Sequence, residues 1–358
     1  MCAVFGALLM LVSGGGLVAW EGLQARYAGA VGRDQLIPGE RAEPPRGAIE
    51  GPLNILLVGI DPRDSEPNWI PRADAVLIMH VSRGLDQAYL FSLPRDLLVD
   101  VPAFPPSGYR GGQDRLGHAM WHGAQVPGQE KPNTAQGFQL LARAVSQYTG
   151  IRTFDAAAII NFTGFRSIVD AMGGVTMYID MDVESIHRQP DGRHRAPSGI
   201  PGAEGADAYV GPRKKYTKGT HHLQGWEALD YVRQRYIPGG DYARQRHQQQ
   251  FIRAMISQAM SRDVVTNPRK LDAVLRAGGK AVIFDGQGRT VLDFAFALRD
   301  LRADSLVMVR LPGDSVGVGG AYQGEQLRPV AKEFLAALRA NQLDAFMAQH
   351  PELANPAR

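Results

Sequence analysis

The chain has 358 residues, 44% of them hydrophobic, which is enough to form the core of one large or two ordinary globular domains. Its 39 Lys and Arg against 36 Asp and Glu give a formal charge of +3, a surplus too small to indicate nucleic-acid binding by itself. Only seven of these cations are lysines, so the basic character comes from arginine, and the single cysteine excludes a disulfide within the chain.

The N-terminus is apolar. Residues 1–20 carry no charge, and Glu21 is the first ionised side chain. Because about 20 mostly apolar residues are what an α-helix needs to cross a bilayer, we expect a single-pass transmembrane anchor. A cleaved secretory signal and a buried helix are the alternatives. An anchor would place the rest of the chain outside the cytoplasm at the cell membrane, and residues 21–52, rich in Gly, Pro, Arg and Glu, predict an extracytoplasmic stalk.

Residues 53–340 predict one α/β domain. Short apolar runs bounded by Gly, Pro, Asp or Arg are typical of buried strands, and longer segments have helical spacing. The expected strands are Leu53–Val58, Ala75–Val81, Gln87–Leu93, Ala156–Asn161, Val175–Ile179 and Leu306–Leu311. The expected helices are Thr134–Tyr148, Phe165–Met172, residues 268–277, Val291–Leu301 and Gln326–Arg339. Their alternation indicates layers of helix and sheet. Residues 341–358 are expected to form a C-terminal tail.

Residues 185–220 interrupt this alternation. His, Arg and Lys are set among Gly, Pro and Ser, with hardly any residues suited to a core. One interpretation is a mobile basic insertion. The other is a basic lip over an anionic polymer or a membrane surface.

Two further helices bring arginines together. Gln224–Val232 has helical spacing, and Arg233 and Arg235 would diverge by about 200° if that helix continued. Pro238-Gly239-Gly240 predicts that it ends, which lets the two side chains converge. Asp241 is then expected to cap a new helix that carries Arg244 and Gln248 on one stripe near its positive end.

More arginines adjoin the predicted strands, in Arg72-Ala73-Asp74 and Leu93-Pro94-Arg95-Asp96. A guanidinium is a planar fork of donors that matches phosphate oxygens and stays charged at neutral pH. Folding could bring these arginines to the helix boundary, so the sequence predicts a site for a polyanion, with pyrophosphate as the natural candidate.

Two aspartates follow or open the first two strands. Asp61 comes after Val58-Gly59-Ile60, and Asp74 precedes Ala75–Val81. Two carboxylates, completed by substrate phosphates and waters, are a usual way of holding Mg²⁺. The alternative is that each caps a turn or pairs with a neighbouring arginine.

These motifs, in this order, resemble the LytR-CpsA-Psr family over roughly residues 53–260. They are Asn54–Arg63, Arg72–Asp74, Ser92–Asp96, Ile160–Phe165, Val169–Val175, Tyr231–Arg235 and Asp241–Arg244. The resemblance implies a three-layer α-β-α domain around a mixed sheet, with a long apolar tunnel for a polyprenyl chain. It also implies an anchored phosphotransferase. Such an enzyme moves a glycopolymer such as teichoic acid, with one phosphate, from a polyprenyl-pyrophosphate carrier to a peptidoglycan hydroxyl.

The resemblance also implies residue roles. Asp61 and Asp74 would hold Mg²⁺. The residues that would bind the pyrophosphate are Arg72, Arg95, Arg233, Arg235, Arg244 and Gln248. Arg95, Asp74 and Asp96 are the catalytic candidates, and Asp96 is either the base for the acceptor hydroxyl or the partner that orients Arg95.

The chain departs from the family pattern at uncharged positions and at one arginine. Ile60, Pro62, Ala73 and Ala75 replace small polar residues, and His247 stands where a second arginine is usual. Because the other charged residues remain, we expect an altered pocket rather than a lost activity.

Two other classes of function stay open. One is a non-catalytic carrier of polyprenyl lipids. The other is a transcriptional attenuator, which an exported domain without a helix-turn-helix motif disfavours, so we expect no nucleic-acid partner.

Overall fold

The computed structural model describes most of the chain between residues 32 and 355. The described ranges are 32–39, 47–62, 68–259, 273–274, 276–279, 282–301, 304–317 and 319–355. The predicted anchor, residues 1–20, lies outside them, and so does most of the helix predicted over residues 268–277. Within these ranges, none of the helices combines the length and the apolar content needed to cross a bilayer.

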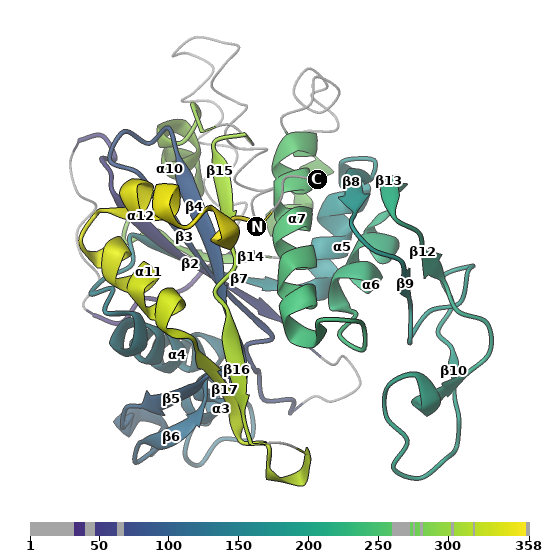
Figure 1. Ribbon diagram of the computed structural model, residues 1–358. Helices are drawn as coiled ribbons and strands as arrows, with labels where there is room; N and C mark the ends of the chain where they lie inside the picture. Colours follow the sequence, from purple (N-terminus) through teal and green to yellow (C-terminus); the bar gives the residue numbers. More distant parts are fainter. Residues whose placement is uncertain are drawn as a thin grey trace.

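A seven-stranded mixed sheet forms the centre of the molecule (Figure 1). β2 lies in its middle, parallel to β7 and antiparallel to β3. In spatial order the strands are β1 Gly32–Arg33, β14 Val282–Asp285, β7 Ala156–Asn161, β2 Leu53–Ile60, β3 Ala75–Val81, β4 Ala88–Leu93 and β15 Leu306–Val309. The predicted mixed central sheet is therefore confirmed.

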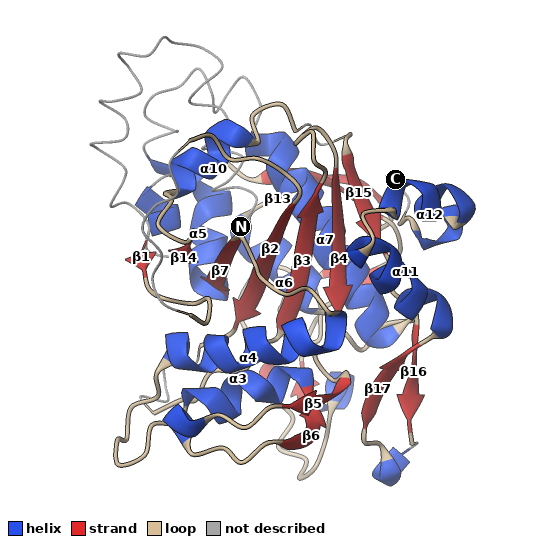
Figure 2. Ribbon diagram, turned by 90° about the vertical axis from the view of Figure 1, so that its left-hand side faces the viewer, coloured by secondary structure: helices blue, strands red, loops and turns tan. Residues whose placement is uncertain are grey.

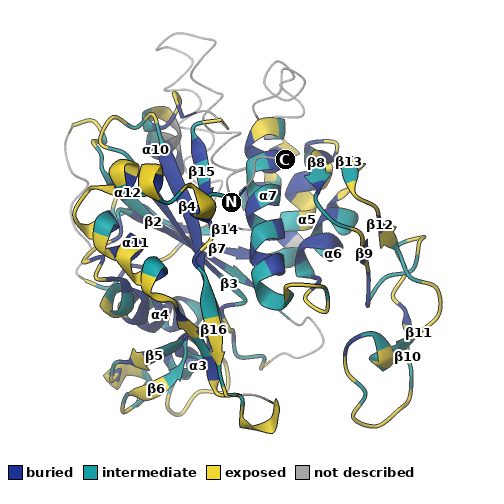
Figure 3. Cartoon of the chain, in the orientation of Figure 1, coloured by how far each residue is buried: buried dark blue, intermediate teal, exposed yellow. Residues whose placement is uncertain are grey.

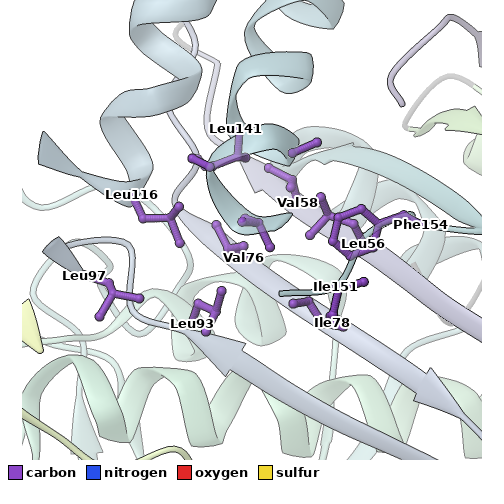
Figure 4. Packing of buried hydrophobic residues seen from close by; sticks show 14 of the residues in the cluster. Leu56, Val58, Val76, Ile78, Leu93, Leu97, Leu116, Leu141, Ile151 and Phe154 are labelled. Atoms are coloured by element: carbon purple, nitrogen blue, oxygen red, sulfur yellow. The ribbon is translucent and has the colours of Figure 1, made fainter. Parts of the chain in front are cut away.

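Helices cover both faces of this sheet (Figures 1 and 2). One layer contains α5 Phe162–Ala171, α6 Gly225–Arg233, α7 Gly240–Ala259 and α10 Val291–Ala297. The other contains α3 Leu116–Ala124, α4 Thr134–Thr149, α11 Pro329–Arg339 and α12 Leu343–Gln349. Successive strand residues point to opposite faces, so Ile55 and Leu57 of β2 pack in the first core, whereas Leu56 and Val58 pack in the second (Figure 4). The arrangement is the expected three-layer α-β-α domain.

Smaller elements surround the sheet. They are β5 Leu98–Val101, β6 Gly112–Arg115, β8 Val175–Ile179, β9 Val183–Glu184, β10 Ala196–Pro197, β11 Tyr209–Val210, β12 Lys215–Tyr216, β13 Gly219–Leu223, β16 Gly313–Val316 and β17 Gly324–Leu327. Single 3₁₀ turns are η1 Pro105–Ser107, η2 Gly205–Ala208, η3 Gly319–Ala321 and η4 Pro351–Leu353. β8 has the predicted bounds but belongs to a separate two-stranded ribbon with β13. The segment that opens with Gln326 is also partly strand, because β17 precedes α11.

Two segments predicted to lie outside the domain pack onto it. In the predicted stalk, β1 forms the edge of the sheet, and the buried Leu36 and Ile37 donate their backbone N–H groups to Asp285 Oδ2, each at 2.9 Å. In the predicted C-terminal tail, α12 buries Leu343 and Met347. Short apolar stretches near both ends of the described chain therefore complete the second core.

Candidate functional site

The predicted site lies at one end of the neighbouring strands β2, β3 and β4. β2 ends at Ile60, just before Asp61, and the antiparallel β3 begins just after Asp74. The backbone N–H of Asp74 donates to the Gly59 carbonyl at 2.9 Å and joins the two strand ends. β4 runs antiparallel to β3 and ends one residue before Pro94-Arg95. The strand topology thus places Asp61, Asp74 and Arg95 at the same end of these three strands.

The remaining arginines lie at or near the break between α6 and α7. α6 begins with a capping box formed by Gln224 and Glu227, and it ends at Arg233 because Gln234 takes an extended conformation. The predicted helix end is confirmed, and it lets Arg233 and Arg235 face the same cavity. α7 begins at Gly240, so Asp241 lies in its first turn and is not the cap that the sequence predicted.

These elements enclose a polar cavity of about 460 Å³. Seven residues predicted from the sequence line it: Asp61, Asp74, Arg95, Arg233, Arg235, Arg244 and Gln248. Four guanidinium groups, two carboxylates and one amide therefore converge from segments spread over nearly 190 positions of the sequence. Such a concentration of positive charge is suited to an anion with several oxygens.

The carboxylates hold the arginines in place. Arg95 Nη1 lies 2.8 Å from Asp74 Oδ1, and Arg244 Nη2 lies 2.6 Å from Asp241 Oδ1. Arg233 forms an ion pair with Asp61 and lies over the Phe162 ring. These pairs fix the direction of the guanidinium groups, and each group keeps further N–H donors for a ligand.

Burial and neighbouring carboxylates shift the guanidinium pKa of two of the arginines. Arg244 is only 6% exposed, and this burial lowers the pKa of its guanidinium. For Arg95, burial alone would lower the pKa, but the carboxylates of Asp96 and Asp74 outweigh it and raise the pKa. Among the described residues, the buried Nε atoms of both arginines have no hydrogen-bond partner. Each of the two side chains therefore has one buried N–H donor that the described residues do not satisfy.

Two predicted site residues lie outside the cavity lining. Arg72 is exposed, and its guanidinium carbon lies 6.0 Å from the centre of the Trp121 ring. Asp96 contacts Arg95 at 3.5 Å and Arg115 at 3.7 Å. The geometry favours Asp96 as the group that orients Arg95 over its alternative role as a base.

A close backbone approach fixes the Arg95 loop. Gly117, in the first turn of α3, donates its N–H to the Arg95 carbonyl at 2.7 Å and accepts from the Ala73 N–H at 3.3 Å. A Cβ at this position would lie 2.8 Å from the Ala73 carbonyl oxygen, so only glycine permits the contact.

A further wall of the cavity lies mostly in a part of the chain for which the sequence left two interpretations, a mobile basic insertion and a basic lip. It consists of Ile186, His187, Glu204, Gly205, Ala208, Tyr209 and Tyr236, most of them from the 185–220 segment. This segment extends to one side of the sheet around β10 and β11, and it is partly buried (Figures 1 and 3).

A buried network attaches this segment to α6. Asp230 accepts hydrogen bonds from the Ser185 hydroxyl at 2.9 Å, the Tyr216 hydroxyl at 2.8 Å and the Gln234 amide at 3.0 Å. Gln234 also accepts the Ile186 N–H at 3.1 Å. The expectation of hardly any core material in this segment was therefore wrong.

One wall residue titrates in an unusual range. Burial, followed by the charges of Arg233, His194, Arg188 and Arg235, lowers the pKa of His187 to about 4. At neutral pH the imidazole is therefore uncharged, and it adds a neutral polar group to a strongly cationic cavity.

An apolar cavity of about 70 Å³ adjoins the polar one. Phe162 and Gln248 line both cavities. Beyond them the walls are aliphatic and aromatic side chains of β2, β3, α5, α6 and α7, including Leu229, Phe251 and Ile252. A charged headgroup and an apolar chain of one molecule could thus occupy adjacent spaces.

His247, the departure from the family pattern, lies away from the cavity lining. It is fully buried, stacks on Tyr231 with ring centres 4.4 Å apart, and its Nε2 lies 3.1 Å from Asp180 Oδ1. The presence of His247 in place of an arginine therefore leaves the arginines of the cavity unchanged. The positive charge that is missing would have stood at a buried position of the core.

The sequence predicted two carboxylates, Asp61 and Asp74, as metal ligands. Within the described part of the chain, no group of three or more His, Cys, Asp and Glu side chains could hold a metal ion. Asp61 and Asp74 both line the cavity, and each is partly exposed. This donor set suits an ion that takes its remaining ligands from phosphates and water, as Mg²⁺ commonly does.

Comparison of sequences identifies relatives. Residues 32–340 match the LytR_cpsA_psr family. The cell wall biosynthesis protein LcpA of Corynebacterium glutamicum is 27% identical over 378 residues, which cover 99% of this chain and 65% of LcpA. The chain thus spans slightly less than two thirds of that relative. The polyisoprenyl-teichoic acid–peptidoglycan teichoic acid transferase TagU of Enterococcus faecalis is 27% identical over 257 residues, 71% of this chain and 70% of TagU.

Solved structures share the fold. The protein gbs0355 of Streptococcus agalactiae has a TM-score of 0.59 at 21% identity, with 82% of this chain and 88% of that chain covered. TagT bound to LIIa-WTA has a TM-score of 0.54 at 22% identity, with coverages of 82% and 91%. These likenesses confirm the mixed α/β architecture.

Proposed function

The chain belongs to the LytR-CpsA-Psr family, and from this membership we propose that it is a phosphotransferase that attaches a glycopolymer to peptidoglycan. The donor is the glycopolymer linked through pyrophosphate to a polyprenyl chain. A sugar hydroxyl of peptidoglycan attacks the phosphorus nearer the polymer, and polyprenyl monophosphate leaves. The product is a phosphodiester between the two polymers.

One observation carries this proposal: an arginine-lined cavity and an apolar cavity share two wall residues, Phe162 and Gln248. A polyprenyl pyrophosphate has a highly charged headgroup directly joined to an apolar chain. The headgroup fits the first cavity in charge, and the chain fits the second in polarity. The second cavity holds only about 70 Å³, so a long lipid requires α5, α6 and α7 to move apart from the sheet.

The arginines supply the main catalytic effect. Phosphoryl transfer requires little covalent chemistry from the protein, and positioning and charge stabilisation provide most of the acceleration. Arg95, which contacts Asp96 and Asp74, would stabilise charge on the transferred phosphate. Arg233 and Arg235 would hold the leaving phosphate. Because Arg244 is almost fully buried, its interaction with a phosphate is weakly screened by water.

Asp61 and Asp74 are the residues that would hold Mg²⁺. When bound, Mg²⁺ would neutralise charge on the pyrophosphate and orient its oxygens. Asp61 pairs with Arg233 and Asp74 with Arg95, so binding of substrate and metal would transfer these arginines from carboxylates to phosphate oxygens. Preformed ion pairs thereby keep the arginines near the position that the substrate needs.

The cellular setting follows from the N-terminal residues. The uncharged stretch 1–20 is long enough for a membrane anchor, which would keep the cavity close to membrane-bound donors and outside the cytoplasm. A retained anchor and an extracytoplasmic domain are part of the proposal.

A transfer assay tests the proposal. The full chain, solubilised in detergent, is incubated with Mg²⁺, a polyprenyl-pyrophosphate-linked oligosaccharide and peptidoglycan, and phosphodiester-linked product is measured by mass spectrometry. We expect product with the unmodified chain and Mg²⁺, and at least about 100-fold less with Arg95→Ala. The control Arg166→Ala removes an exposed arginine that pairs with Asp170 outside the cavity, and it should leave transfer unchanged. Tight lipid binding without any product would instead indicate a lipid carrier.

A further inference from the structure

Three carboxylates line the polar cavity, and one of them has no internal partner. Asp61 and Asp74 pair with Arg233 and Arg95. Glu204 is exposed, and its carboxylate makes no hydrogen bond or ion pair with the residues that the structure describes. A free carboxylate beside four guanidinium groups is available to interact with a substrate.

The wall that carries Glu204 is held firmly. Next to it, Gly205 packs on the Tyr236 ring, where a Cβ would lie 2.9 Å from Cδ1. Arg195 is 4% exposed and donates to the carbonyls of Ile186 at 2.9 Å and Tyr209 at 2.6 Å. These bonds join Ile186 to Tyr209, the two residues that flank the stretch carrying Glu204, and both of them line the cavity.

The geometry of phosphoryl transfer indicates from which side of the cavity the acceptor approaches. In phosphoryl transfer the attacking and leaving oxygens lie roughly in line with the phosphorus, on opposite sides. The leaving lipid phosphate lies toward the apolar cavity, which begins at Phe162 and Gln248 and does not include Glu204. The acceptor must then arrive away from the apolar cavity, and the 185–220 segment lines the polar cavity but not the apolar one.

We propose that Glu204 is the general base that activates the acceptor hydroxyl, an inference that rests on the transferase function proposed above. The hydroxyl oxygen forms a bond to the phosphorus attached to the glycopolymer, and its proton passes to the Glu204 carboxylate. The bond from that phosphorus to the bridging oxygen breaks, and the electron pair leaves with polyprenyl monophosphate. Asp61 and Asp74 each form an ion pair with an arginine of the cavity, and Asp96 lies outside the cavity lining. Glu204 is therefore the carboxylate of the cavity that is available as a base.

Isosteric and truncated variants test this role in the transfer assay. General bases usually contribute about 100- to 10,000-fold, so Glu204→Gln should lower kcat by at least about 100-fold. Its affinity for farnesyl pyrophosphate, measured by titration calorimetry, should stay within about twofold. For Glu204→Ala, added formate should restore part of the rate, because a small carboxylate can occupy the vacated space. The matched control Glu184→Gln alters an exposed glutamate outside the cavity lining that pairs with Arg213 and Lys215. It should transfer at the unmodified rate.

The outcomes separate the two proposals. No product from the unmodified chain would overturn the transferase function itself. Product from the unmodified chain with an equal kcat for Glu204→Gln would overturn the role of Glu204 and leave the transferase function standing. A slow Glu204→Ala that formate does not restore, with weakened farnesyl pyrophosphate binding, would also overturn it by assigning Glu204 to donor binding.

Discussion

Replacing Arg244 by methionine should separate ligand binding from stability. Methionine has a similar length and no charge, so Arg244→Met removes a nearly buried guanidinium and its bond to Asp241 at 2.6 Å. Asp241 keeps the Gln245 amide at 3.0 Å, and its side chain is 25% exposed to water, so its charge is not left buried alone. The loss of the ion pair is offset by the removal of a desolvated charge, and we expect unfolding free energy to change by no more than about 1–2 kcal/mol.

Binding should change much more. A hydrogen bond to a charged group contributes about 1.5–3 kcal/mol, so the affinity for farnesyl pyrophosphate should fall roughly 10- to 150-fold. Calorimetric titration gives the affinity, and urea denaturation without ligand gives the stability. Arg253→Met is the control on the same helix, because Arg253 donates to the Leu306 carbonyl at 2.6 Å and lies outside the polar cavity. Equal affinity in Arg244→Met and the unmodified chain would refute the assignment of this cavity to pyrophosphate.

Two further predictions concern the cavity walls. The folded chain favours neutral His187, so unfolding takes up a proton below about pH 6.5, and stability is lost as the pH falls toward the folded pKa of about 4. Between pH 7 and 4.5, the unfolding free energy of His187→Gln should fall by about 1–2 kcal/mol less than that of the unmodified chain. The full pKa shift would correspond to about 3 kcal/mol, which is reduced here because the ring is partly exposed. Identical losses of the two chains in urea denaturation would contradict this prediction. Leu229→Phe should partly fill the apolar cavity and exclude one or two methylene groups of the lipid, each worth about 0.8 kcal/mol. Calorimetry should then show roughly tenfold weaker farnesyl pyrophosphate binding with unchanged inorganic pyrophosphate binding, and an equal loss for both ligands would show that the apolar cavity does not hold the lipid.

The parts of the fold that the sequence predicted are those with strong local signals. β3 and β7 have the predicted bounds because buried strands are continuous apolar runs between turn residues. β8 also has the predicted bounds, although its residues alternate between buried and more exposed positions. α6 ends where Pro238-Gly239-Gly240 indicated, and the convergence of Arg233 and Arg235 followed from that ending. The pairing of β8 with β13 was missed, since an apolar run does not reveal its partner strand.

The same reason explains why the sequence did not show which residues of the 185–220 segment line the cavity. Ser185 reaches Asp230 across 45 positions and Tyr216 reaches it across 14, and no local pattern encodes either contact. A single glutamate among Gly, Pro and Ala gives no sign that it faces four arginines, so Glu204 was missed. Asp96 was a candidate through its adjacency to Arg95, but adjacency could not tell whether it entered the cavity.

A crystal structure of the chain with farnesyl pyrophosphate and Mg²⁺ tests the central claim most directly. We predict that the diphosphate lies within hydrogen-bonding distance of Arg95, Arg233, Arg235 and Arg244, with the isoprenoid passing Phe162 into the space between the sheet and its helices. A diphosphate bound elsewhere, or an isoprenoid lying outside that space, would contradict the account.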